Sequence, residues 1–433
     1  MVHWLKRFVP PLVALSLPAQ APLSIQDAIR KAWTDQSGLQ AGAAMVERAL
    51  AESAAMKDLR LPTLSLGAGF SRSNEPMQAF GGKLDQARIT QMDFNPASLN
   101  HPDPITGFGA TLNLAQPLYA GGRLDAARRA GSALAKAEAA NQTHRKQQVA
   151  LAVDQAYFGT QVAEQALVYA QDTLKQAEET EHFVVARVDQ GLMLASEGER
   201  CKAFRAQSQA GVAEAQQRVA SARSALALLL GSDSVDATLS TPIDAPAPQD
   251  SAPGLRADLE ATRLQGEAAQ AGVTAAQGNL KPEVGLNLTA GTARYAFSAG
   301  GNWTTVALGA KWTFNFSDTH RLHAAKASVR AAELELKWQE AQASRAVREA
   351  RASVSTAQAQ IAFAKVAVTA SESVRRIRSA RHREGLLPLM EVLDAESGLS
   401  GARTLLLNSE LAFRLSQAQL ALALGQPIEG VKE

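Results

Sequence analysis

Residues 108–123, FGATLNLAQPLYAGGR, join two kinds of structure at one corner of the chain. Over 108–115 apolar residues alternate with small or polar ones, which predicts a strand with one oily and one wet face. We expect Pro117 to end this strand, because proline has no N–H to give to the ladder. Gly121 and Gly122 supply a turn, and from Arg123 onward the pattern is helical and alanine-rich. A short two-faced strand that leads into a very long helix is uncommon in a soluble globular domain.

Two stretches without proline and with little glycine predict very long helices. The first starts at Arg123 and is broken at Gly191-Leu192, and the second is broken at Gly385-Leu386. Roughly 66 residues at about 1.5 Å per residue make a rod on the order of 100 Å long. The rods and the helices that return from them are expected over residues 123–189, 196–230, 319–384 and 389–424.

The chain carries this layout twice. Gly191 and Gly385 are 194 residues apart, and so are Gly231 and Gly425, so two independent landmarks share one offset. This spacing indicates the duplication of a unit that contains a helix, two strands, a rod and a return helix. We expect a first repeat over 22–231, a linker rich in Pro, Asp and Ser over 232–253, a second repeat over 254–425 and a tail over 426–433.

The remaining elements follow from the same patterns. Ser24 is a plausible N-cap for an amphipathic helical region that ends before Pro62. Residues 74–106 are rich in Asn, Pro, Asp and Gly, which predicts one long exposed loop. The expected helices are 23–59 and 254–277, the expected strands are 64–71, 108–115, 284–289 and 305–316, and a shorter loop is expected over 294–302.

Residues 1–21 have the pattern of a secretory signal. Lys6 and Arg7 form a charged start, an apolar centre follows, and Ala19-Gln20-Ala21 is an A-x-A cleavage site. The alternative is a frayed N-terminus of a cytosolic protein. Past Ala21 no stretch approaches the roughly 20 apolar residues of a membrane helix. We therefore expect an exported chain that no helix anchors.

Composition excludes several classes of partner and site. Removal of Lys6 and Arg7 takes the formal charge from +2 to 0, and a neutral chain with interspersed charges gives no electrostatic argument for nucleic acid. The single cysteine, Cys201, allows neither an internal disulfide nor a thiolate metal cluster, and it lies far from the cleavage site where a lipid anchor would be attached.

The strands determine the class of protein. A soluble sandwich would show the same alternation, but strands of about ten residues also span a bilayer when tilted. Four strands cannot close into a barrel, and open strand edges are not tolerated in hydrocarbon. Three copies would supply 12 strands around a water-filled lumen. The sequence also has an export signal and two long helical segments without a hydrophobic core of their own. Together these features favour an α/β membrane channel built from two internal repeats.

The sequence resembles the TolC family of outer-membrane efflux proteins. The corner QPLYAGGR (116–123) and the tip segments GLMLASEGER (191–200) and GLLPLMEVLDAE (385–396) carry the resemblance, which covers 23–425. It implies a homotrimer in the outer membrane of a Gram-negative bacterium, with a 12-stranded barrel continued by a periplasmic helical barrel. It also implies that a periplasmic adaptor and an inner-membrane efflux pump or ABC transporter deliver small molecules or proteins for export. The first tip departs from the family pattern at Glu197 to Arg200.

Glu391 and Asp394 are candidate gate residues. They are three residues apart and therefore neighbours on one helix face. Three copies could place six carboxylates at the tunnel end, where the family has its entrance constriction. The alternative is that they favour a helix N-terminus through its dipole, a role that Glu197 and Glu199 fit equally well.

Arginines and leucines near the tips are further candidates. Arg378, Arg381 and Arg383 belong to a cluster that begins at Arg375 and precedes the second tip. They are either cations at a helix C-terminus or clamps that hold the tip carboxylates in a closed state. The turn residues are either contact points for the adaptor or caps folded back on their own helices; they are Gly191, Leu192, Gly385 and Leu386.

No phosphate loop, zinc spacing or nucleophile elbow is present in the sequence, so we expect a non-enzyme without metal or cofactor. His320, His323 and His382 are expected at the surface, and Cys201 as a small packed side chain. The competing function is a periplasmic coiled-coil scaffold or adaptor that does not span the membrane. A periplasmic hydrolase lacks any supporting set of residues. The cargo is chosen mainly by the pump and cannot be read from this chain.

Overall fold

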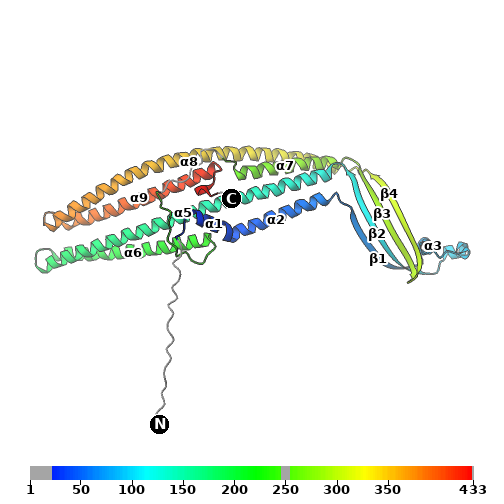
Figure 1. Cartoon of the computed structure of the whole chain (residues 1–433), viewed down its shortest axis with the longest axis horizontal. Coiled ribbons are helices and arrows are strands. Elements are labelled where there is room, and N and C mark those ends of the chain that lie inside the picture. Colours follow the sequence, from blue (N-terminus) through cyan, green and yellow to red (C-terminus); the bar gives the residue numbers. More distant parts are fainter. Residues whose placement is uncertain (1–21, 245–253, 432–433) are drawn as a thin grey trace, which may run out of the picture. The chain divides into compact units, whose positions relative to one another are not determined.

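The structure is a computed structural model that describes residues 22–244 and 254–431 (Figure 1). The expected signal peptide over 1–21 and the later part of the expected linker lie outside the described residues. The chain divides into two compact units. The strand unit comprises 42–142 and 257–341, and the helical unit comprises the described parts of 1–41, 143–256 and 342–433.

The strand unit contains one antiparallel sheet of four strands, in the order β1-β2-β3-β4 (Figure 1). Its edges are β1 and β4, whose outer sides have no neighbouring strand among the described residues. The strands are β1 (Thr63–Ser73), β2 (Ile105–Ala120), β3 (Glu283–Ala296) and β4 (Ala299–Lys311). The sequence predicted four strands, and each includes residues where its strand was expected.

Several strand boundaries differ from the prediction. Strand β2 continues past Pro117 to Ala120, because a shift of register between Pro117 and Tyr119 removes the need for a ladder N–H there. Strands β3 and β4 run through the expected loop at 294–302 and leave only Phe297 and Ser298 between them. Strand β4 ends at Lys311 and not at 316, and Asn315 then caps the next helix by accepting from the backbone N–H of Ser317 at 3.1 Å.

The expected loop at 74–106 contains structure of its own. It forms α3 (Pro76–Asp85), the 3₁₀ helix η1 (Gln91–Phe94) and α4 (Pro96–Asn100) before β2 begins. Lys83 pairs with Asp93 at 2.6 Å, and the rings of Phe80 and Phe94 meet edge to face at 5.7 Å. Ala79 is buried in this segment. Its burial, with the ion pair and the ring contact, explains why the segment is folded and is not an exposed loop.

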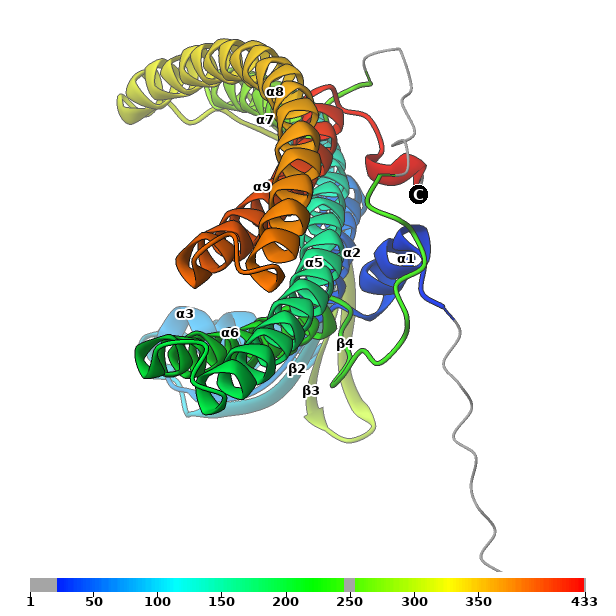
Figure 2. The same ribbon diagram turned by 90° about the vertical axis from the view of Figure 1, so that its left-hand side faces the viewer.

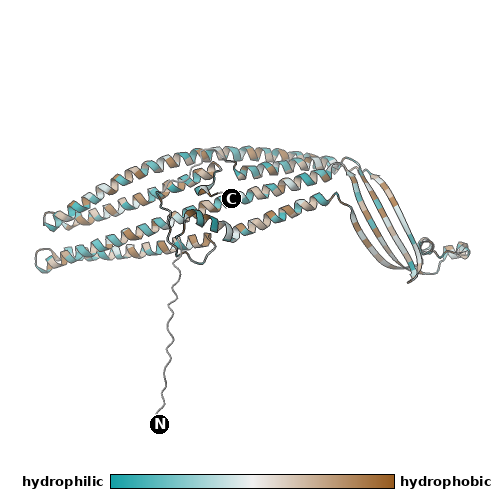
Figure 3. Ribbon diagram, in the orientation of Figure 1, coloured by the Kyte–Doolittle hydropathy of each residue, from teal (hydrophilic) through white to brown (hydrophobic). Residues whose placement is uncertain are grey.

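The register places leucines of all four strands on one face of the sheet. Leu66 pairs with Leu112, and Leu286 pairs with Leu308. We call this the leucine face; Figure 3 shows the alternation along the strands. The opposite, polar face carries Asn113, whose Oδ1 accepts a hydrogen bond of 2.9 Å from Oγ1 of Thr289. Leu288 also lies on the leucine face, and Asn287 and Lys311 lie on the polar face.

The long helices have the predicted extents. Helix α5 (Arg123–Asp189) and helix α8 (Ser317–Arg383) have 67 residues each, and α6 (Ala195–Leu229) and α9 (Leu389–Ala423) have 35 residues each. Each long helix forms a hairpin with its return helix (Figure 2). The starts of α8 and α9 follow those of α5 and α6 by 194 residues, which confirms the duplication.

The two repeats differ in length, and the positions of the shorter helices show where the extra residues lie. Helix α7 (Ala257–Gly278) starts 220 residues after α2 (Ser37–Asp58), whereas the long helices are offset by 194. The 26-residue change in offset falls in the segment between β1 and β2, where the first repeat carries α3, η1 and α4. The expected single helix over 23–59 is in fact two helices, α1 (Ile25–Asp35) and α2, because Gln36 has an extended backbone.

The helical unit has an apolar core around α1. Ile25 and Ile29 of α1 pack against Tyr157 and Phe158 of α5, and all four side chains are fully buried. Tyr157 Oη donates a 2.7 Å hydrogen bond to the carbonyl of Leu23. Ser24 caps α1 by accepting from the backbone N–H of Asp27 at 3.1 Å, as predicted. The 3₁₀ helix η2 (Ile428–Gly430) adds Ile428 to this core, so part of the expected tail over 426–433 is packed.

We predict opposite labelling at two neighbouring positions of β2. With Cys201 replaced by serine, Asn113→Cys should react rapidly with a membrane-impermeant thiol reagent, and Leu112→Cys should be protected by lipid. Leu112→Arg should cost roughly 2–4 kcal/mol near the membrane midplane because a charge enters hydrocarbon. Rapid labelling at 112 together with protection at 113 would reverse the assignment of the two faces.

Candidate functional site

Aromatic side chains border the leucine face at both ends. Phe70 and Phe108, which are paired across β1 and β2, lie toward the hairpin turns. Trp312, Phe314 and Phe316 follow β4 at the helical end, and all three are exposed. Aromatic rings favour the interface between lipid headgroups and water. The leucine face thus has the apolar band and the two aromatic girdles of a sheet that crosses a membrane.

The corner between strands and long helices is closely packed. Gly121 and Gly122 have φ of 63° and 91°, as the predicted turn requires. A Cβ on Gly121 would lie 2.3 Å from the carbonyl oxygen of Gly278, so the end of α7 leaves no space for a side chain. Arg123 forms an ion pair with Glu283 at the start of β3 and donates to Asn279 Oδ1 at 3.2 Å. The first residue of α5 is therefore tied to the second repeat.

Both helical hairpins turn in the same way at their tips. The backbone N–H of Leu192 donates to the carbonyl of Arg187 at 2.8 Å, and that of Leu386 donates to the carbonyl of Arg381 at 2.9 Å. Gly191 and Gly385 have φ of 72° and 79°, so both turns are Schellman motifs that need glycine. Leu192 and Leu386 are each 68% exposed, so neither of these leucines folds back as a buried cap.

The structure brings the two candidate gate carboxylates to one arginine. Arg378 Nη1 lies 3.1 Å from Glu391 Oε2 and 2.9 Å from Asp394 Oδ2, and it also donates to the carbonyl of Glu391 at 3.2 Å. Both carboxylates stand in the first two turns of α9, and Arg378 stands on α8. Asp394 is largely exposed and Arg378 is partly exposed. Such partly exposed pairs typically contribute about 0–1 kcal/mol each.

The other arginines of the cluster behave differently. Arg381 and Arg383 form no ion pair with any described residue, and the carbonyl of Arg383 accepts from Arg187 Nη2 at 3.1 Å. Arg375 lies 3.6 Å from the buried Glu396, whose pKa is raised by burial. His382, expected at the surface, is buried. Its Nδ1–H donates to the carbonyl of Leu387 at 2.8 Å, which satisfies one polar atom of the buried ring. His320 and His323 are exposed.

The divergent first tip supplies an apolar contact between the hairpins. Val184 and Cys201 are buried with Leu389 of the second hairpin, and the Phe183 ring meets His382 edge to face at 6.0 Å. Val184 stands 194 residues before Arg378, so the first hairpin has an apolar side chain where the second has this arginine. Burial, with the negative charges of nearby glutamates, raises the pKa of Cys201 to about 11 and keeps it an unreactive packed thiol.

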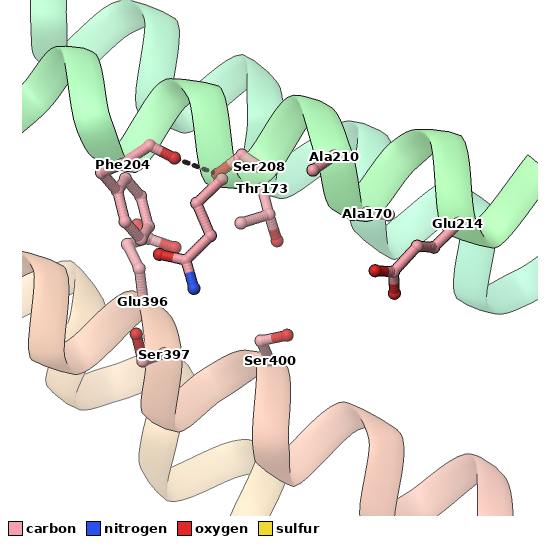
Figure 4. A pocket seen from close by; sticks show the side chains of 11 residues that line it. Ala170, Thr173, Phe204, Ser208, Ala210, Glu214, Glu396, Ser397 and Ser400 are labelled. Atoms are coloured by element: carbon pink, nitrogen blue, oxygen red, sulfur yellow. Dashed lines mark hydrogen bonds between the residues drawn. The ribbon is translucent and has the colours of Figure 1, made fainter.

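Farther from the tips the hairpins face each other across a hollow of about 420 Å³ that polar and apolar side chains line together (Figure 4). Phe204 and Ser208 of α6 line one side, and Glu396, Ser397 and Ser400 of α9 line the other. Ala170, Phe204 and Ala210 add apolar surface to this lining, so the junction is neither a dry core nor a purely polar cleft.

Sequence reasoning missed an arginine that joins the hairpins. Arg403 of α9 contacts Asp172 of α5 at 2.8 Å and Glu372 of α8 at 3.5 Å, and its guanidinium stacks 4.7 Å from the centroid of the Tyr169 ring. Its partners are distant in sequence, and no local pattern marks them. Like Arg378, Arg403 pairs with two carboxylates, but its contacts link three helices.

A buried charged cluster in the helical unit was also missed. Arg414 of α9 pairs with Glu429 of η2 at 2.8 Å and stacks on the Phe158 ring at 4.5 Å. Asp154 of α5 is fully buried nearby, beside the carboxylate of Glu429. Burial, and next the negative charge of Glu429, raises the pKa of Asp154 to about 8 despite the opposing charge of Arg414. Asp154 is therefore largely protonated at neutral pH.

Comparison with known proteins identifies the class. The family model for outer membrane efflux proteins matches residues 28–232 and 250–426 of this chain. The chain therefore belongs to the outer membrane efflux protein family. A search of curated protein sequences gave no significant match.

Solved structures share the fold. The transmembrane channel CusC is 22% identical with a TM-score of 0.81, and the match covers 93% of this chain and 92% of CusC. The outer membrane protein VceC from Vibrio cholerae is 21% identical (TM-score 0.78; 93% and 96% covered). The open outer membrane channel MtrE from Neisseria gonorrhoeae is also 21% identical (TM-score 0.78; 94% and 89% covered). These likenesses confirm the expected TolC-like fold.

The protein is thus an outer-membrane efflux channel with a helical extension in the periplasm. Family membership confirms the expectation of a transport protein that is not an enzyme, and it excludes the competing scaffold that does not reach the membrane. None of the described helices is long and apolar enough to cross a membrane. Within the described residues no group of three or more His, Cys, Asp or Glu could hold a metal ion.

We predict that Asp154→Asn makes the stability of the protein less dependent on pH. The folded pKa of about 8 lies above the unfolded value near 4, so the free energy of unfolding of the wild type falls as pH rises through this window. The asparagine variant lacks this loss, which is on the order of a few kcal/mol. Melting temperatures at pH 5 and pH 9 should therefore differ less in the variant.

Asp189→Asn, at an exposed position of α5, is the control and should leave the pH dependence of the wild type unchanged. Parallel melting curves for the wild type and Asp154→Asn across this range would contradict a protonated buried Asp154.

Proposed function

We propose that three copies of the chain close their sheets into one 12-stranded barrel and export cargo that a periplasmic adaptor and an inner-membrane pump deliver. The observation that carries the trimer is the sheet itself: four strands with two unpaired edges and a band of exposed leucines. Unpaired backbone groups in hydrocarbon cost several kcal/mol each, so β4 of one protomer must pair with β1 of the next. The resemblance to the TolC family supports three copies.

The size of the assembly is tested by extraction and heating. The full chain should leave the membrane only with detergent, run as a trimer in mass photometry, and convert to a monomer on a denaturing gel only after boiling. A monomer released by osmotic shock would contradict the channel assembly.

The proposed entrance of the tunnel is a ring of Glu391 and Asp394. Three copies would bring six carboxylates to one axis, and Arg378 neutralises part of this charge in each protomer. Carboxylate rings draw in cations and impede anions. Arg378 acts as the clamp, since it joins α8 to the start of α9, whereas Arg381 and Arg383 lie on the same helix turns as free cations. Opening then requires the second hairpin to swing outward.

We predict opposite changes from the two halves of this cluster. Glu391→Ala with Asp394→Ala should lower the preference for cations in planar bilayers and weaken block by multivalent cations. Arg378→Ala should raise both, because it leaves the carboxylates without their cation. Both effects follow from charge at a narrow passage and should fade at high salt.

The matched control is Glu199→Ala on the first hairpin, a surface carboxylate that pairs with Lys202 at 2.7 Å. It should leave ion preference unchanged, and all variants should assemble like the wild type. If the doubly substituted channel keeps the ion preference and block of the wild type, these carboxylates serve only the helix N-terminus.

The proposed adaptor contacts are the two hairpin tips. Leu192 and Leu386 are exposed at equivalent turns, where an apolar side chain is available to a protein partner. Gly191 and Gly385 set the turns that present them. Ser substitution of both leucines should therefore reduce co-purification with the proposed periplasmic adaptor and leave the trimer intact. Unchanged co-purification would limit these residues to a role within the turn.

A further inference from the structure

The leucine face ends, toward the hairpin turns, in a hollow with a cation in its wall. The hollow measures about 520 Å³ and is lined by the rings of Phe70 and Phe108, by Thr292 and Arg294 of β3, and by Phe297 in the turn. Phe70 pairs with Phe108, and Phe108 pairs with Arg294. Two rings and a guanidinium group therefore stand in one row across three strands.

Neutral groups hold Arg294 in place. Its Nε donates to Thr292 Oγ1 at 2.9 Å, and its Nη2 donates to Asn302 Oδ1 at 3.2 Å. A second arginine, Arg72, is exposed one row farther out on the same face of β1, opposite Thr106. Neither arginine forms an ion pair with any residue that the structure describes. This end of the leucine face therefore has two positive charges without an ion-pair partner among the described residues.

The arginines at the opposite end of the strands are different. Arg60 forms an ion pair with Asp125, and Arg123 forms one with Glu283. In an outer-membrane channel the helical end is periplasmic, so the unbalanced arginines lie at the outer leaflet. An arginine whose only role is to extend its guanidinium group into water needs neither hydrogen bonds that fix its orientation nor an aromatic hollow beside it.

We propose that this hollow binds the phosphate-bearing head of an acylated glycolipid in the outer leaflet. Guanidinium groups bind phosphate through two parallel hydrogen bonds and shed water more easily than ammonium groups. The rings of Phe70, Phe108 and Phe297 offer an apolar wall for the upper part of the acyl chains. The inference rests on the proposed barrel, in which the leucine face meets lipid.

The experiment uses the full channel, purified in detergent and titrated with lipid A in native mass spectrometry. The wild type should bind lipid A in preference to a dephosphorylated form with the same acyl chains. Arg72→Gln with Arg294→Gln should weaken binding of the phosphorylated form by about tenfold or more and leave the dephosphorylated form unaffected. Lys311→Gln is the matched control, because it removes a cation of β4 from the polar face, and it should bind like the wild type.

Each outcome has one meaning. Inorganic phosphate at millimolar concentration should not displace the lipid if the acyl chains contribute, and full displacement would overturn the lipid site in favour of an anion site. Equal binding of lipid A to the wild type and the double variant would overturn it as well. The two single variants, Arg72→Gln and Arg294→Gln, serve if the double variant does not assemble. The same spectra report the number of protomers, so failure of the barrel itself is seen separately.

Discussion

The unpaired edges of the four-stranded sheet constrain everything else in this protein. Strands β1 and β4 present backbone N–H and C=O groups that water can satisfy but hydrocarbon cannot. A sheet with one continuous leucine face is thus stable in a membrane only when other copies complete it. The corner at Gly121 and the ion pair of Arg123 with Glu283 then hold the start of α5 on the second repeat. Membrane insertion thus depends on the backbone groups of the two edge strands, and the start of the helices depends on the packed corner.

The helical unit combines a rigid region with a loosely joined one. Around α1 the core is apolar and fully buried, and it includes Ile25, Tyr157 and Ile428. Toward the tips the hairpins meet through the small buried cluster of Val184, Cys201 and Leu389, through the ion pair of Arg403 with Asp172, and across a hollow with a mixed lining. Apolar burial stabilises by about 25 cal/mol per Å², whereas exposed ion pairs contribute about 1 kcal/mol or less. The buried contact between the hairpins at the tips is therefore much smaller than the core around α1.

Much of the fold could be predicted because its signals are local. Alternation revealed the strands, the absence of proline revealed the rods, and the shared spacing of Gly191 and Gly385 revealed the repeat. What could not be predicted depends on distant partners. Pro117 stays in its strand because of a bulge against β3, and the Arg414–Glu429 pair and the buried Asp154 come together only when α5, α9 and η2 pack. At the tips, sequence suggested the carboxylates and the turns, but only the structure selected Arg378 from its cluster as their partner.

The two hairpins of the sheet are unequal at the cell surface. Phe297 and Ser298 alone connect β3 to β4, whereas α3, η1 and α4 all lie between β1 and β2. Antibodies and bacteriophages that approach from outside therefore meet one substantial segment per chain. Escape from them by mutation would concentrate in that segment. Its freedom to vary is nonetheless limited at Ala79 and Gln86, which are buried, so an escaping variant must change the exposed residues and keep these anchors.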